Sequence, residues 1–240
     1  MKGFNWTNIR LLLMVVLVIF LFSFTSKRNE KRKIVKSVVV FVGENTLFIK
    51  QETVNKLLIE NKKEVQSIRR EDLDLNKLEK AIGAQAMIDE SDVFVSIDGV
   101  LKAVVKQKTP IARIFDNGTS FYIDYKGNNM PLSANFTARV PLVSGEINAK
   151  NKKDLTEIFR AIYNDAFLKK NIIGIQIMPN GSLLMLNRNF DYQIDFGSVR
   201  NAERKFKNYK AFFQKAVSDS VLTKYKKIDL RFTEQVVCTK

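Results

Sequence analysis

Histidine is absent from the 240-residue chain, and cysteine occurs only once, at Cys238. The lack of histidine removes the commonest general base, the usual metal ligand and every histidine-containing catalytic triad. A single cysteine excludes an internal disulfide and a paired-cysteine metal site. Glycine-rich phosphate loops and nucleophile elbows are also missing. The sequence therefore predicts no cofactor, no metal site and no catalytic residues, and it favours a binding protein over an enzyme.

Acidic residues are the minority charge, since 25 Asp and Glu stand against 40 Lys and Arg and leave a net charge of +15. A nucleic-acid surface would normally add exposed aromatic residues among the basic ones, and no such pattern is present. We therefore predict no nucleic-acid partner. The one dense basic run, residues 27–36, directly follows an apolar stretch, so we expect it to meet the lipid headgroups of a membrane.

That apolar stretch, residues 11–22, contains twelve apolar residues without a break. Crossing the hydrocarbon of a bilayer takes about 20 helical residues. The segment from Trp6 to Ser26 supplies that length if the Arg10 side chain reaches back to the headgroups. We therefore expect a short cytoplasmic tail at residues 1–8, a transmembrane helix at 9–26 and a basic juxtamembrane stem at 27–34.

Two questions about this anchor remain open at the level of the residues. A cleaved signal peptide is the alternative, but the end of the run lacks the small residues of a cleavage site. For orientation, six basic residues follow the run, whereas only Lys2 and Arg10 precede it. Because basic residues beside a membrane tend to stay in the cytoplasm, the charge count alone places the following domain there.

The rest of the chain alternates between the periodicities of strands and helices. A capping box from Asn76 to Glu79 suggests where the second helix begins, and the helix at 199–217 has an apolar face that includes Phe206, Tyr209 and Val217. Hairpins are expected at Asp98-Gly99, Asn117-Gly118 and Pro179-Asn180-Gly181. The expected helices are 48–61, 73–88, 153–167 and 199–217, and the expected strands are 34–42, 93–97, 101–105, 110–115, 121–123, 172–177, 182–186, 192–196, 227–232 and 235–239.

Three strings resemble the bacterial cell-division family FtsQ (DivIB): IDGVLKAVVKQKTPIARIF at 97–115, YIDYKGNNMPLSANFTARVPLVSG at 122–145 and IDLRFTEQVVCTK at 228–240. The second has the form found in the Bacteroidetes branch, and Lys108 departs from the family's usual arginine. The resemblance covers nearly the whole chain. It implies an α+β fold: a single N-terminal transmembrane helix, a POTRA domain (strand-helix-helix-hairpin) at 35–107, and an FtsQ-type β domain at 108–240, which is a mixed α/β domain built on an antiparallel-rich sheet.

The resemblance also implies a function and a location. The family is a non-enzymatic scaffold that recruits FtsB and FtsL through the β domain and links early and late division proteins to septal peptidoglycan synthesis. FtsK is a further candidate partner, at the POTRA domain. The protein would be a single-pass type II protein of the cell inner membrane, with its C-terminal domains in the periplasm at the division septum. This orientation reverses the one that the charge count favours.

In the family, FtsB adds a strand next to the last strand of the β domain, and an exposed sheet edge offers the unpaired backbone groups that this requires. Which of Val236 and Val237 faces the core is left open. Matching the terminal regions predicts a partner-binding set of Gln235, Val236, Val237, Cys238, Thr239 and Lys240 at the edge, Lys227, Asp229 and Arg231 on the neighbouring strand, and Arg200 and Arg204 on the flanking helix.

Two other functions compete with the scaffold. A membrane-anchored peptidoglycan-acting enzyme would need an acid or a nucleophile in a cleft, and the sequence offers no good candidate. A POTRA-type secretion chaperone would be expected to carry a barrel or repeated POTRA units, and neither is visible in the sequence.

Overall fold

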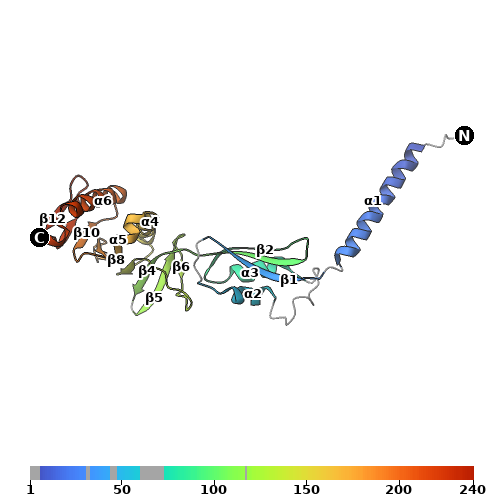
Figure 1. Cartoon of the computed structure of the whole chain (residues 1–240), viewed down its shortest axis with the longest axis horizontal. Helices are drawn as coiled ribbons and strands as arrows, with labels where there is room; N and C mark the ends of the chain where they lie inside the picture. Colours follow the sequence, from blue (N-terminus) through green and yellow to red (C-terminus); the bar gives the residue numbers. More distant parts are fainter. Residues whose placement is uncertain (1–5, 31–32, 44–47, 60–72, 117) are drawn as a thin grey trace. The chain divides into compact units, whose positions relative to one another are not determined.

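The computed structural model describes residues 6–30, 33–43, 48–59, 73–116 and 118–240 (Figure 1). The chain divides into two compact units. One consists of Met1–Asn45 and Ile49–Gln107, and the other of Thr46–Phe48 and Lys108–Lys240.

The N-terminal helix α1 (Trp6–Glu30) contains the apolar run. Its segment Ile9–Lys27 has a mean hydropathy of 2.5 and is long and apolar enough to cross a membrane. The helix continues into the segment that the sequence assigned to the basic stem. Residues 1–5 of the predicted tail and residues 31–32 of the predicted stem lie outside the described residues.

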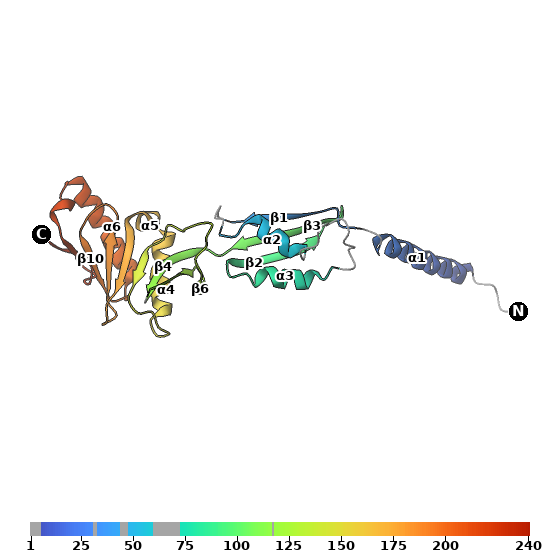
Figure 2. The same ribbon diagram turned by 90° about the horizontal axis from the view of Figure 1, so that it is seen from below.

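The first unit also contains a three-stranded sheet with two helices packed against it. In the sheet, β3 is central, pairing in parallel with β1 and antiparallel with β2. The helices bury Val54, Leu58, Leu78 and Ile82 in one core with strand residues such as Leu101. Figure 2 shows α2 and α3 lying over the strands. The elements are β1 (Lys36–Val42), α2 (Gln51–Leu58), α3 (Leu75–Gly83), β2 (Ile88–Val95) and β3 (Val100–Gln107).

The predicted start of α3 is wrong. The side chain of Asp74 caps the helix, because its Oδ1 accepts a hydrogen bond from the backbone N–H of Lys77 at 3.0 Å. The expected capping box from Asn76 to Glu79 therefore does not form, and the helix ends at Gly83 rather than at residue 88. The end of the first predicted helix, residues 60–61, lies outside the described residues.

The second unit is built on a nine-stranded mixed sheet in the order β12-β11-β10-β9-β8-β7-β4-β5-β6. Three neighbouring pairs are parallel (β4 with β7, β7 with β8, β10 with β11), and the other pairs are antiparallel. The strands are β4 (Pro110–Asp116), β5 (Thr119–Asp124), β6 (Asn129–Met130), β7 (Leu142–Ser144), β8 (Ile172–Ile177), β9 (Leu183–Asn187), β10 (Gln193–Gly197), β11 (Lys227–Asp229) and β12 (Val237–Thr239).

Three helices and a short 3-10 turn complete this unit. Phe159, Leu168 and Phe206 come from different helices and share one core with strand residues such as Ile175 and Ile194. The predicted α+β fold, with an apolar N-terminal helix and a sheet-rich C-terminal region, is confirmed. The helical elements are α4 (Lys152–Asn164), α5 (Ala166–Asn171), α6 (Ala202–Ser218) and η3 (Leu222–Lys224).

Other expectations for this unit need correction. The helix expected at 153–167 is interrupted at Asp165, whose side chain caps α5 by accepting hydrogen bonds from the N–H groups of Phe167 and Leu168. On α6, Val217 is 48% exposed and does not belong to the apolar face. The strand expected at 227–232 ends at Asp229. The hairpin of β4 and β5 forms, but Asn117 of its predicted turn lies outside the described residues.

Candidate functional site

The last strand, β12, lies at one edge of the nine-stranded sheet. It pairs antiparallel with β11, so that Lys227 lies opposite Thr239 and Asp229 opposite Val237. Within the part of the chain that the structure describes, no other strand pairs with β12. An edge strand of this kind presents a row of backbone groups with which another extended chain can pair.

The hydrogen bonds of β11 show which backbone groups of β12 face outward. The N–H of Gln193 donates to the carbonyl of Lys226, and the N–H of Leu230 donates to the carbonyl of Asp195. These two bonds turn the backbone groups of Ile228 toward β10, so those of Lys227 and Asp229 face β12, where the N–H of Lys226 also donates to the carbonyl of Thr239. Because backbone groups alternate along a strand, Val237 and Thr239 bond to β11, and the N–H and C=O of Cys238 point to the free edge.

The side chains of the terminal segment divide between the two faces of the sheet. Val236 and Cys238 are half-buried and pack against the main core, whereas Val237 is 40% exposed. Val236 therefore faces the core and Val237 faces away from it. Burial raises the pKa of the Cys238 thiol, so it stays protonated at neutral pH and packs as a small core residue. Gln235, Thr239 and Lys240 are exposed.

The charged residues predicted on the neighbouring strand form a cluster among themselves. Lys227 Nζ lies 2.7 Å from Asp195 Oδ2, and Arg231 Nε donates to both carboxylate oxygens of Asp229 at 3.0 Å. Asp195 and Asp229 are both buried, with 8% and 7% of the residue exposed. The hydrogen bond from Arg231 lowers the pKa of Asp229 and keeps it ionised. These charges neutralise one another, so their direct role is to hold β11 beside β10.

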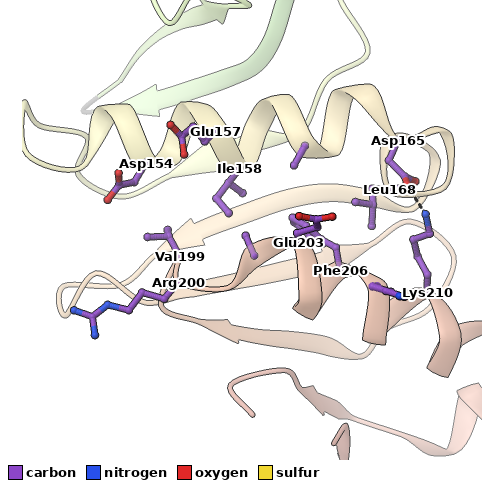
Figure 3. A pocket seen from close by; sticks show the side chains of 13 residues that line it. Asp154, Glu157, Ile158, Asp165, Leu168, Val199, Arg200, Glu203, Phe206 and Lys210 are labelled. Atoms are coloured by element: carbon purple, nitrogen blue, oxygen red, sulfur yellow. Dashed lines mark hydrogen bonds and ion pairs between the residues drawn. The ribbon is translucent and has the colours of Figure 1, made fainter. Parts of the chain in front are cut away.

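Helix α6 anchors the segment that leads into β12. Arg204 forms an ion pair with Glu234 at 2.7 Å, and Asn208 Nδ2 donates to the backbone carbonyl of Thr233 at 2.8 Å. Arg204 thus holds the segment before β12, and its predicted contact with a partner stays a prediction. Arg200 does not reach this segment; it lines a groove between α4 and α6 (Figure 3).

The model of the family described as "FtsQ/DivIB, C-terminal related" matches residues 109–239, which include the whole terminal edge. This chain belongs to the FtsQ/DivIB family. The resemblance seen in the sequence is thereby confirmed, and all the matched residues lie within the second unit.

Two known proteins are similar to parts of this FtsQ/DivIB chain. The chain is 26% identical over 156 residues to the cell division protein FtsQ of Salinibacter ruber, and the match covers 59% of this chain and 60% of that protein. It thus spans less than two thirds of its relative. A solved structure of the major extracytoplasmic domain of the division protein DivIB from Geobacillus stearothermophilus is 15% identical, covers 32% of this chain and 69% of that one, and has a TM-score of 0.27.

Sequence reasoning missed two features of this FtsQ/DivIB edge. Asp195 completes the charge cluster, but it lies in a strand with no motif around it, so only the parallel pairing of β10 with β11 brings it to Lys227. Asn208 was not predicted, because a single polar residue on a helix does not by its position indicate a contact with another segment. Among the residues that the structure describes, no group of three or more His, Cys, Asp or Glu side chains could hold a metal ion.

Proposed function

We propose that this chain is a non-enzymatic scaffold of the bacterial cell-division complex, and that FtsB, in complex with FtsL, adds an extended segment as a further strand at the free edge of β12. The family membership supports the cell-division role, as does the name of the Salinibacter relative. One observation carries the binding site: β12 lies at the edge of the sheet, and its register with β11 directs the N–H and C=O of Cys238 outward.

The proposal includes a location. Helix α1 would hold the protein in the inner membrane as a single-pass type II protein, with residues 35–107 as a POTRA domain and 108–240 as the β domain on the periplasmic side at the septum. The basic stem would contact lipid headgroups, and FtsK would dock on the POTRA domain. The length and apolarity of α1 support the anchor, and large domains cross membranes largely regardless of their flanking charge.

The sharpest test places a proline at the free edge. Cys238→Pro removes the outward N–H, whereas the bonds to β11 belong to Val237 and Thr239 and can remain. The full chain in lipid nanodiscs is titrated with the purified FtsB–FtsL complex from the same organism. We expect Cys238→Pro to weaken binding by about tenfold or more, and the control Cys238→Ala, which keeps the N–H, to bind within about twofold of the parent.

Near-ultraviolet circular dichroism checks that the proline variant is folded. A folded Cys238→Pro variant with the parent affinity would rule out strand addition at this edge. If proline disrupts the unit, Val237→Glu replaces it, because the Val237 side chain already faces solvent. The charge should weaken binding at the edge, and Thr223→Glu, an equivalent change at another exposed position, should not.

The non-enzymatic part of the proposal has its own test. The purified full chain is incubated with cell-wall peptidoglycan, and released fragments are measured by chromatography. We expect no turnover above that of a blank preparation. Robust turnover would instead favour the membrane-anchored peptidoglycan enzyme.

A further inference from the structure

A groove of about 900 Å³ runs between α4 and α6, on a part of the second unit that the terminal edge does not use (Figure 3). Its floor is apolar and belongs to the main core: Ile158, Leu168 and Phe206 are each at most 4% exposed. Ala161 and Ala202 also line it. Because these two alanines are small, an incoming element can approach the floor closely.

The groove is closed at one end by a fixed contact. Lys210 on α6 forms an ion pair with Asp165, which also caps α5. Asp154 lies near the other end, and the rise of α4 from Asp154 to Asn164 is about 15 Å, or nearly three helical turns. The groove thus has the length of a short helix.

Charged side chains rim the groove without pairing. On the α4 side, Asp154 and Glu157 are exposed and lie three residues apart, so they share one face of the helix. On the α6 side, the rim carries Arg200 and Lys207 together with Glu203. Among the described residues, none of these five side chains takes part in an ion pair. The acidic side chains of α4 thus stand out in a protein of net charge +15, and within the described residues they form no ion pair.

The walls also decide which secondary structure can fit. They consist of side chains on helices whose backbone groups are paired internally, so an extended segment would leave its own N–H and C=O groups unpaired in the groove. A helix satisfies its own backbone and needs only an apolar stripe at positions i, i+3 or i+4, and i+7.

From this geometry we propose that the groove docks a three-turn amphipathic helix of a partner protein, with a basic flank against Asp154 and Glu157 and an acidic flank against Arg200 and Lys207. The inference is independent of strand addition at β12, because Arg204 and Asn208, which hold the terminal segment, are absent from the lining of the groove.

The test uses two synthetic peptides of about 14 residues, each held helical by a hydrocarbon staple. Both carry leucines spaced three and four residues apart; the first has lysines on one flank and glutamates on the other, and the second has glutamates on both. They are titrated by fluorescence anisotropy against the full chain in nanodiscs. We expect the parent protein to prefer the mixed peptide by roughly fivefold, as two rim ion pairs allow.

Reversing the acidic wall should reverse this preference. In Asp154→Lys/Glu157→Lys the α4 wall becomes basic and the α6 wall keeps Arg200 and Lys207 beside Glu203, so the all-acidic peptide should bind better than the mixed one, whichever way it runs along the groove. The control Asp116→Lys/Asp191→Lys makes the same change in net charge at exposed positions outside the groove and should leave the order unchanged. Ala161→Trp should fill the floor and abolish binding of both peptides, with Ala202→Trp as the substitute if the first variant does not fold.

Several results would overturn the inference. The first is that neither peptide binds measurably. The second is that the wall-reversed variant keeps the peptide preference of the parent. The third is that the peptides still bind to both tryptophan variants. Concentration-dependent dimerisation of the full chain that Ala161→Trp abolishes would mean that a second copy occupies the groove, which also contradicts it. Cys238→Pro should leave peptide binding unchanged, which separates this test from that of the terminal edge.

Discussion

Tyr209 shows how single polar groups organise the interior of the second unit. Its hydroxyl lies 2.9 Å from that of Tyr192 and accepts a hydrogen bond from Asn187 Nδ2 at 2.9 Å. Burial raises the pKa of both tyrosines, so both stay neutral. The helical period of α6 predicted that Tyr209 faces the core, but its partners lie on β9 and before β10. No spacing in the sequence reveals such a contact.

Removing the Tyr209 hydroxyl should therefore cost more than removing that of Tyr192. Tyr209→Phe leaves two buried polar groups without a partner, which we expect to lower the free energy of unfolding by about 1–3 kcal/mol. Tyr192→Phe leaves the bond between Asn187 and Tyr209 in place and should cost about 1 kcal/mol or less. Urea denaturation followed by near-ultraviolet circular dichroism gives both values, and equal costs would show that the three groups do not act as a network.

Lys205 is a buried basic residue of α6 that the sequence analysis did not single out. It is 3% exposed, and its ammonium group donates to the carbonyls of Phe196 and Ser198 at 2.9 and 2.7 Å. Burial lowers the pKa of Lys205, an effect that Asp195 and Asp229 oppose. On a helix of 3.6 residues per turn, Lys205 lies next to Phe206. A lysine side chain would nevertheless be expected to face the solvent on the basis of residue type alone. Its hydrogen bonds to the carbonyls at the end of β10 hold the side chain in the interior instead.

We expect Lys205→Met to destabilise the protein by about 1–3 kcal/mol, because two carbonyls lose their donor while the volume is nearly kept. The matched control is Lys207→Met, two residues away on the exposed side, which should change stability by no more than about 0.5 kcal/mol. Thermal unfolding in detergent micelles measures both. If the two variants melt at the same temperature, the Lys205 contacts contribute nothing to the fold.

At the scale of elements, sequence periodicity located most helices and strands and missed how they begin and end. Periodicity predicted one helix at residues 153–167, yet the structure has two helices, α4 and α5, divided at Asp165. Asp165 caps α5 and also forms an ion pair with Lys210, which lies 45 residues away in the chain, so no local pattern reveals the contact. The start of α3 at Asp74 was missed for a simpler reason: two acceptor residues lie close together, and either could cap.

Asp165 should stabilise the protein in two separable ways. Asp165→Asn keeps a capping side chain and loses the charge beside Lys210, whereas Asp165→Ala loses both, so the alanine variant should be less stable than the asparagine variant by about 1 kcal/mol. Chemical denaturation at neutral pH compares the two. Equal stability of the variants would show that the cap is not needed for α5.

The same residue predicts a pH dependence. Burial would raise the pKa of Asp165, but the hydrogen bonds from Lys210 and Leu168 outweigh it, so the pKa is lower than in the unfolded chain. Its contribution is therefore fully present above about pH 4 and is lost as the pH falls through the folded pKa. The asparagine variant should lose less stability than the parent between pH 5 and pH 2, and parallel losses would contradict the assignment.

For the whole molecule, residue patterns predicted the individual elements, whereas the family resemblance predicted the position of the last strand. Residue patterns predicted helices, strands and one apolar helix. Each element that buries one face repeats its apolar residues at its own helical or strand period, and this repeat is visible in the local sequence. The patterns could not predict the order of strands in the sheet, since the pairing of β10 with β11 joins residues more than thirty positions apart. The place of β12 at the edge was expected from the family alone, and the structure agrees with it.

Membrane orientation is where charge and family disagree, and thiol labelling can decide between them. The native thiol is half-buried with a raised pKa, so the label is placed at Lys153→Cys, an exposed position of α4, in a Cys238→Ala background. We expect a membrane-impermeant maleimide to modify intact spheroplasts fully, as the periplasmic orientation requires. Labelling that occurs only after permeabilisation would place the second unit in the cytoplasm.

The central claim, that a partner strand pairs with β12, can be tested at a single amide. Hydrogen exchange is measured by NMR on the full chain in nanodiscs, free and saturated with the FtsB–FtsL complex. In the free protein the outward N–H of Cys238 should exchange faster than the N–H of Val237, which bonds to β11. In the complex we expect exchange at Cys238 to slow by about tenfold or more, with little change at Val237. Unchanged exchange at Cys238 in a fully formed complex would contradict strand addition at this edge.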